Sequence, residues 1–302
     1  MTNDTAIPEG ETGFDQVLAF TLPDRNARGR VVRLGPVLAT ILAAHDYPTA
    51  IRHLLVEALV LTALTGSLLK DEGAQLTIQA QAEGAIVDLL VCDYRAGELR
   101  GYVRHDAVRL AALGKFPSLK ALFGSGYLAI TFDLAEPAQR YQGIVPLEGA
   151  SLSAACEAYF AQSEQVPTII RTAIRWDGHN CVAGGLLVQH LAEGEQGRER
   201  LHVRMDHPEW EHVSILADST RHDELLDPAL SLETLVWRLF HEEREIRIAP
   251  QPGLSRGCRC SEEYYTTVLK RFPEEDRVNM QGDDGLVSVD CAFCSRVFKI
   301  DL

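Results

Sequence analysis

The sequence lacks the features that direct a protein into a membrane or onto a nucleic acid. Residues 1–13 are polar, with neither the basic start nor the apolar run of a signal peptide. The most apolar stretch, residues 54–69, is too short for a membrane span and contains Glu57. Acidic residues outnumber basic ones by 43 to 29, and the net charge of −14 opposes binding to phosphate backbones. We therefore expect a cytoplasmic protein without a membrane or nucleic-acid partner.

A nucleotide-binding loop is also missing from the sequence. No segment matches G-x-x-x-x-G-K-[ST], so no ATP-driven activity is indicated. Apolar sequence, in contrast, is plentiful. With 302 residues and 46% hydrophobic content, the chain is expected to bury a sizeable core in two or three domains, preceded by a disordered tail over residues 1–13.

Four of the seven cysteines lie in two close pairs near the C-terminus, Cys258-x-Cys260 and Cys291-x-x-Cys294. Four thiolates suit a soft, tetrahedral ion, and we expect one structural Zn²⁺ held by all four, with no open position for a catalytic water. The first pair is unusual, because zinc ribbons mostly use C-x-x-C twice. A disulfide across so small a ring is strained and therefore labile. The site is thus either a metal cross-link that oxidation can break or a purely structural zinc ribbon.

The other three cysteines stand alone in the sequence. Cys92, Cys156 and Cys181 each have apolar neighbours. Because buried free thiols behave as small hydrophobic groups, we expect all three in the core.

Residues 14–192 mix strand and helix patterns without regular alternation, which indicates an α+β domain with helices packed on an antiparallel sheet. Alternating patterns and turn residues predict strands over 30–34, 75–81, 85–93, 98–104, 127–134, 140–146, 169–176 and 182–188. Helices are predicted over 37–44 and 50–70 and after a Ser151 cap. The helix over 50–70 is apolar on all sides, so we expect it at the centre of the core.

Residues 193–250 are a more acidic segment, with fourteen Asp or Glu against seven Arg and no Lys. Two apolar stripes at helical spacing predict short amphipathic helices, the second after a Ser231 cap. Such helices are marginal unless their apolar faces are packed, so the segment is either a docked helical linker or a metastable element that can expose its stripes. The stripe residues are Trp210, Val213, Leu216, Leu232, Leu235, Val236, Leu239 and Phe240. The scattered histidines of this segment, His207 among them, are expected to face solvent.

Several longer stretches, together with the cysteine pairs, carry a specific resemblance along essentially the whole chain. They are RGRVVRL at 28–34, LTIQAQAEG at 76–84, GYLAIT at 126–131, RYQGIVPLEG at 140–149 and YFAQSEQVPT at 159–168. In these stretches the chain resembles the 33 kDa heat-shock protein family of redox-regulated holdase chaperones.

The resemblance implies an α+β core over 14–192, a metastable helical linker over 193–250 and a zinc-binding redox-switch domain over 251–302. It also implies a mechanism, in which the reduced, zinc-bound form is inactive. Oxidation would pair Cys258 with Cys260 and Cys291 with Cys294, expel zinc and expose a surface for unfolding client proteins. The apolar stripes of the linker are the candidate client-binding residues. Oxidised chains would associate as homodimers, and no catalysis is implied.

One departure from the family lies after the first cysteine pair. The family often has Ser followed by a basic-rich segment there, whereas in this chain Ser261 is followed by Glu262 and Glu263. Acidic neighbours raise the pKa of a thiol, so the oxidant threshold could differ from that of other members. Two alternatives stay open on the residues alone. One is a thiol-disulfide oxidoreductase that uses Cys291-x-x-Cys294, although that motif normally opens a helix after a strand. The other is a zinc-ribbon nucleic-acid module, which the acidic balance disfavours.

Overall fold

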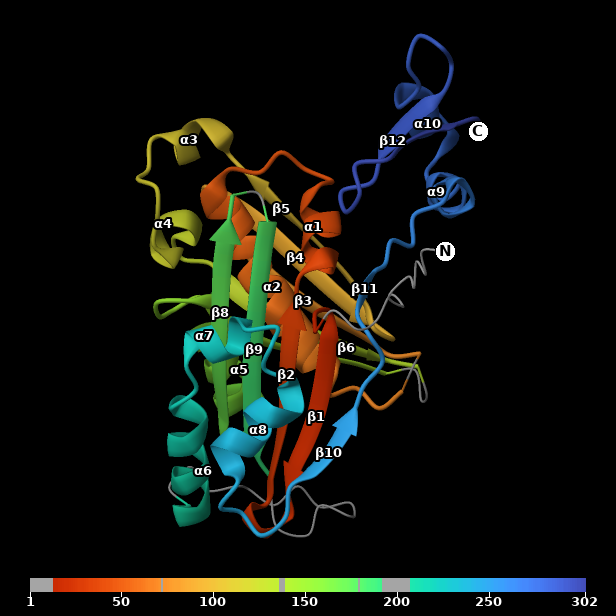
Figure 1. The fold of residues 1–302 in the computed structure, drawn as a ribbon. Coiled ribbons are helices and arrows are strands. Elements are labelled where there is room, and N and C mark those ends of the chain that lie inside the picture. The colour runs from red at the N-terminus through yellow and green to blue at the C-terminus, as the bar shows by residue number, and fades with distance from the viewer. Residues whose placement is uncertain (1–12, 72, 136–138, 179, 192–206) are drawn as a thin grey trace, which may run out of the picture.

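Most strands of the protein belong to two large sheets that lie on either side of one long helix (Figure 1). The computed structural model describes residues 13–71, 73–135, 139–178, 180–191 and 207–302. The first sheet has the order β10-β1-β2-β9-β8, with β10 (Arg247–Pro250), β1 (Gln16–Leu22), β2 (Ala27–Leu34), β9 (Asn180–His190) and β8 (Thr168–Asp177). All its neighbouring strands are antiparallel.

The second sheet has six strands in the order β11-β5-β4-β3-β6-β7. They are β11 (Ser255–Arg256), β5 (Glu98–His105), β4 (Val87–Arg95), β3 (Gln75–Gln81), β6 (Tyr127–Leu134) and β7 (Gln139–Pro146). Strand β11 runs parallel to β5, and the other pairs are antiparallel. The predicted α+β class and antiparallel strands are therefore confirmed, although the strands are divided between two sheets.

The central helix α2 (Thr49–Gly66) contacts strands of both sheets and has thirteen buried residues among its eighteen. This confirms the helix that the all-round apolar pattern placed in the core. By length and composition α2 could cross a membrane, but 72% of this stretch is buried inside the protein, as is usual for a core helix. The remaining helices of this part are α1 (Pro36–Leu42), α3 (Ala107–Ala111), α4 (Leu119–Phe123) and α5 (Leu152–Tyr159), with short turns at Pro23–Arg25 and Phe160–Glu164.

The outer face of the five-stranded sheet is covered by three helices of the acidic segment, α6 (Pro208–Asp218), α7 (His222–Leu226) and α8 (Leu232–Phe240) (Figure 1). Their apolar side chains form one buried cluster with Leu18 and Phe20 of β1 and Val188 of β9. The Ser231 cap is confirmed, because its hydroxyl accepts a hydrogen bond from the N–H of Thr234.

The C-terminal segment consists of α9 (Glu262–Leu269), α10 (Glu274–Asn279) and a hairpin of β12 (Val287–Asp290) and β13 (Val297–Ile300). Its own core is small, with Leu269, Val287 and Ile300 as the buried apolar residues and a few partly buried neighbours.

A strap, residues 247–260, joins α8 to the C-terminal segment and is bonded to both sheets on the way. It begins as β10 along β1, and Leu254 then donates its N–H to the carbonyl of Asp15 at 2.7 Å. It continues as β11 along β5. Residues on both sides of the predicted boundary at 250 therefore pair with core strands, and the domain boundaries themselves remain a prediction. The tail predicted over residues 1–13 lies outside the described residues except for Gly13.

Sequence patterns did not identify β1. Its residues from Val17 to Phe20 are all buried, with Val17 toward α2 and Leu18 toward α6–α8. A strand that is buried on both faces shows no alternation, so the period-two signal is missing.

Arg33 of β2 is wholly buried and fastens α7 to the sheet. Its guanidinium donates to three backbone carbonyls, those of Leu225 at 3.0 Å, Leu230 at 2.8 Å and Glu224 at 3.2 Å. Arg33→Met keeps much of the volume but leaves these carbonyls without the donor. We expect the free energy of unfolding to fall by about 3 kcal/mol in chemical denaturation.

The matched control for this prediction is Arg104→Met. Arg104 pairs with Asp88 on the surface, where its side chain is 64% exposed, so the loss should be at most about 1 kcal/mol. Equal losses in the two variants would contradict the role given to Arg33.

Candidate metal centre

The four paired cysteines converge on one point of the C-terminal segment. Cys258 and Cys260 follow β11, and Cys291 and Cys294 lie in the turn between β12 and β13. The Sγ atom of Cys258 lies 3.3 Å from that of Cys260 and 3.6 Å from that of Cys291, and the Sγ atoms of Cys260 and Cys294 are 3.4 Å apart. All four are free thiols. The convergence expected from their spacing is therefore present.

The cluster has the composition and size of a metal site. All four sulfurs lie within 4.8 Å of one another. Sulfurs at about 2.3 Å from a tetrahedral metal are separated by roughly 3.8 Å, close to the separations observed between neighbouring pairs. The four cysteines can therefore hold a metal ion without rearrangement of the chain.

Backbone hydrogen bonds shape the second cysteine pair into a tight turn. The carbonyl of Cys291 accepts from the N–H groups of Cys294 at 3.2 Å and Ser295 at 2.8 Å, and the N–H of Cys291 donates to Arg296. Ser295 has a φ of 56°, in the left-handed region that closes such turns. The motif thus lies between two strands and does not open a helix, so the structural context of a thioredoxin-like dithiol is missing at this site.

The surroundings make the cysteines electrostatically unequal. Burial opposes ionisation of Cys291, but hydrogen bonds to its sulfur from Tyr265 and from the N–H groups of Phe293 and Cys294 hold its pKa at about 7, below the ordinary thiol value. Burial and the sulfurs of the other three cysteines raise the pKa of Cys260. The largest causes of this rise therefore do not include Glu262 and Glu263, to which the sequence interpretation attributed it.

The cysteine turn also rests on the core through Phe293. Its ring lies 3.9 Å below the guanidinium carbon of Arg100 and meets the ring of Tyr102 edge-on, with centroids 4.9 Å apart. Both partners belong to β5. Close by, the hydroxyl of Ser295 donates to the carbonyl of Ala44 at 2.6 Å. The sequence did not predict these contacts of Phe293 and Ser295, because the spacing of the cysteines does not indicate which surface the turn packs against.

Arg259, between the first two cysteines, adds an ionic contact to the same surface. Its guanidinium lies 3.4 Å from the carboxylate of Asp93 in β4, which also pairs with Arg100 at 2.6 Å. The metal-type site is therefore tied to the six-stranded sheet at both cysteine pairs.

The eight candidate client-binding residues all lie in one place, away from the cysteines. Trp210, Val213, Leu232, Leu235, Val236 and Phe240 are buried, and Leu216 and Leu239 are partly buried, all in the cluster on the five-stranded sheet. The sequence left open a docked linker or a metastable element, and in the described residues the stripes are docked on the five-stranded sheet. The apolar cluster of the C-terminal segment shares no member with theirs, and the metastability of the linker stays a prediction.

The structure adds two apolar residues that the stripes left out, Ile215 and Trp237, which are 62% and 59% exposed. They lie on the same helices but off the apolar stripe, so helical spacing assigned them to no buried face.

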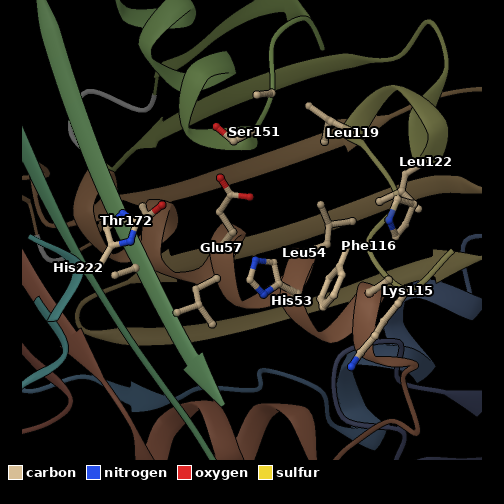
Figure 2. Close-up of a pocket in the computed structure, with 15 residues that line it drawn as sticks. His53, Leu54, Glu57, Lys115, Phe116, Leu119, Leu122, Ser151, Thr172 and His222 are labelled. Carbon is tan, nitrogen blue, oxygen red and sulfur yellow. The ribbon is translucent and has the colours of Figure 1, made fainter.

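A hollow of about 430 Å³ lies on the core between α2, the loop before α4, strand β8 and helix α7 (Figure 2). Its lining includes His53 and Glu57 of α2, Lys115, the 79% exposed Phe116 and His222. The Glu57 carboxylate accepts hydrogen bonds from both the N–H and the hydroxyl of Ser153, so it holds the start of α5. No sequence motif marked this hollow, because its residues come from five distant segments.

The three isolated cysteines are buried, as the sequence predicted. Burial raises the pKa of Cys181 to about 12, and it also raises the pKa of Cys92 and of Cys156. Buried neutral thiols of this kind are unreactive, so these residues do not extend the four-cysteine site.

Fold and site together define a two-sheet α+β protein whose small C-terminal segment carries a four-cysteine, metal-type centre. The Hsp33 protein family model matches residues 15–301, and the chain belongs to this family. It is 42% identical over 295 residues to a 33 kDa chaperonin of Caulobacter vibrioides, with 95% of each chain covered, and 32% identical to one of Shigella boydii, with 93% and 90% covered. This membership supports a chaperone function.

A solved structure agrees with the assignment at the level of the fold. The crystal structure of the 33 kDa chaperonin, or heat shock protein 33 homolog, of Thermotoga maritima superposes with a TM-score of 0.75 at 22% identity, covering 95% of both chains.

Removing one sulfur donor should weaken metal binding at the centre. Cys260→Ser and Cys294→Ser are each expected to lose at least tenfold in affinity for Co²⁺, because a neutral hydroxyl replaces a thiolate ligand. Titration of the reduced protein, followed by the sulfur-to-cobalt charge-transfer absorption, measures this. Cys181→Ala is the control and should bind like the parent chain; unchanged binding in the two ligand variants would contradict the site.

Phe293→Ala should loosen the cysteine turn from β5 without removing a ligand. The lost ring contacts are worth about 2 kcal/mol together. We expect unchanged metal content but faster metal release to a coloured chelator under mild peroxide. Phe272→Ala, an exposed phenylalanine of the same segment, should release metal at the parental rate. Identical release from both variants would mean that the Phe293 contact does not protect the centre.

Proposed function

We propose that this chain is a redox-regulated, ATP-independent holdase that binds unfolding proteins and prevents their aggregation during oxidative stress. The observation that carries the proposal is that the apolar stripes of the linker are buried against the five-stranded sheet. Eight apolar candidate residues lie packed on the five-stranded sheet, and the strap connects their last helix to the four-cysteine centre. A chaperone with this arrangement is inactive until the stripes leave the sheet.

We assign Zn²⁺ to Cys258, Cys260, Cys291 and Cys294 in the reduced form, one ion per chain. Bound zinc would keep the four sulfurs as thiolates and supply a cross-link, which in small zinc-finger peptides is worth roughly 10–16 kcal/mol. The C-terminal segment needs such a cross-link, because its three buried apolar residues form too small a core to hold it folded.

Oxidation is the proposed trigger. Each cysteine pair gives up two electrons and forms a disulfide, while the oxidant, hypochlorous acid, is reduced to chloride and water. Following the family resemblance, we propose Cys258–Cys260 and Cys291–Cys294 as the products. The sulfurs then no longer offer thiolates, and the C-terminal segment loses its cross-link.

The strap offers a route from the centre to the stripes. Gly257 donates its N–H to the carbonyl of Leu99 directly before Cys258, and Gln251 donates to Val17 at the other end of the strap. Unfolding of residues 258–302 would fray β11 first and β10 next, which frees the chain that follows α8. The linker helices would then be held by their own packing, by Arg33 and by ion pairs to the core such as Arg171 with Asp218.

The proposal extends to partners, location and chemistry. Client proteins would bind the exposed stripes, and oxidised chains would pair as homodimers through surfaces released in the same step. We place the protein in the cytoplasm, where thiols stay reduced until oxidative stress. Its action is non-enzymatic, because binding of clients by apolar surface requires no reaction step.

Light scattering of a client that aggregates on dilution from denaturant tests this function. Scattering should be suppressed by the hypochlorite-treated protein and not by the reduced, zinc-loaded protein. The double variant Cys258→Ser/Cys260→Ser should suppress it without oxidant, whereas Cys181→Ala should behave like the parent chain.

Two results would contradict the proposal in different ways. Equal suppression by both forms would leave a chaperone without a redox switch. Suppression by neither form would reduce the four-cysteine centre to a structural ribbon.

A further inference from the structure

A second group of metal-ligand side chains lies where strand β9 meets helix α6. His190 is the last residue of β9 and is only 3% exposed. His207 is the N-cap residue of α6, and Glu209 stands in the first turn of that helix. One ligand atom from each of the three lies within 4.8 Å of the others. The group therefore connects the core sheet with the first linker helix.

The geometry holds these side chains toward one another. The rings of His190 and His207 have centroids 5.2 Å apart, and the ring of His190 stacks on Trp210 at 5.8 Å with an angle of 15°. Nδ1 of His207 lies 4.0 Å from Oε2 of Glu209. That oxygen is buried and has no hydrogen-bond partner among the described residues. A buried carboxylate oxygen without a donor is costly, and a cation beside it would remove the cost.

The neighbouring charges leave room for a cation at this place. Arg25 is close enough to Glu209 to feel its charge, but its guanidinium is engaged by Glu243, 2.8 Å away. Glu243 also contacts His212 at 2.9 Å. The Arg25 guanidinium is thus already paired with a carboxylate of its own and does not neutralise Glu209 by direct contact.

We propose that His190, His207 and Glu209 form a second metal site, for a divalent ion of the zinc, cobalt or nickel type. Two imidazoles and one carboxylate are ligands that these borderline ions accept, with the remaining position taken by water. This site differs from the four-cysteine centre in ligand type and place.

Occupancy of the site would stabilise the docked position of α6. A ligand that binds only the docked arrangement stabilises it in proportion to its concentration relative to its dissociation constant. Trp210, which stacks on His190, is also a member of the first apolar stripe. The metal would therefore hold that stripe on the sheet, an effect on stability that does not depend on the proposed chaperone activity.

Titration of the reduced full-length protein with Co²⁺ tests this site. The first equivalent should give the intense sulfur charge-transfer bands of the four-cysteine centre. A second, weaker equivalent should add only faint visible bands without further charge transfer, and it should raise the unfolding temperature.

Two conservative variants remove ligands with little damage to the helix. His207→Asn keeps a side chain that caps α6, and Glu209→Gln keeps the size of the carboxylate. Both should lose the second equivalent and its thermal shift and keep the first. His241→Ala, at an exposed position after α8, is the control and should keep both. A parent chain that takes up only one equivalent, or a second equivalent that survives in both ligand variants, would overturn the proposal.

Discussion

The five-stranded sheet is apolar on both faces, and this constraint organises the molecule. One face packs against α2, and the other has to be covered by α6, α7 and α8. Each fully buried Leu, Val or Phe side chain contributes roughly 1.5–3 kcal/mol relative to its exposed state. The acidic segment is therefore more than a tether between two domains, because its helices complete the second core of the protein. The same packing keeps the apolar stripes of this strongly acidic chain, with its net charge of −14, away from solvent.

The strap connects the linker helices to the four-cysteine centre. A short parallel strand such as β11, with two paired residues, is a weak attachment by itself. It is backed by the contacts of the cysteine turn, with Phe293 on Arg100 and Arg259 beside Asp93. A stable C-terminal segment thus holds the strap against both sheets. Loss of that stability would weaken the attachment of the linker by releasing the edge strands β10 and β11, while the inner strands of both sheets stay paired.

Sequence patterns predicted the elements whose side chains report their environment directly. The all-round apolar helix α2, the capped helix α8 and the convergence of the cysteine pairs were predicted from residues alone. Strand β1 was missed because burial on both faces removes its alternation, and β10 because all four of its residues are exposed at a sheet edge. Periodicity predicted that the linker stripes need a partner surface, but it could not say which sheet provides that surface. Likewise, His207 was expected to face solvent. In the structure its ring lies beside that of His190, a contact that depends on the tertiary fold and has no signal in the sequence.

Hydrogen exchange of the linker helices in the reduced and the hypochlorite-oxidised protein tests the central claim most directly. The account predicts that amides of α6 and α8 lose protection on oxidation, together with β10 and β11, while amides of α2, β3 and β9 stay protected. Such a pattern is local unfolding that begins at the metal centre. Unchanged protection of α6 and α8, with exchange confined to residues 258–302, would show that the centre does not control the apolar stripes.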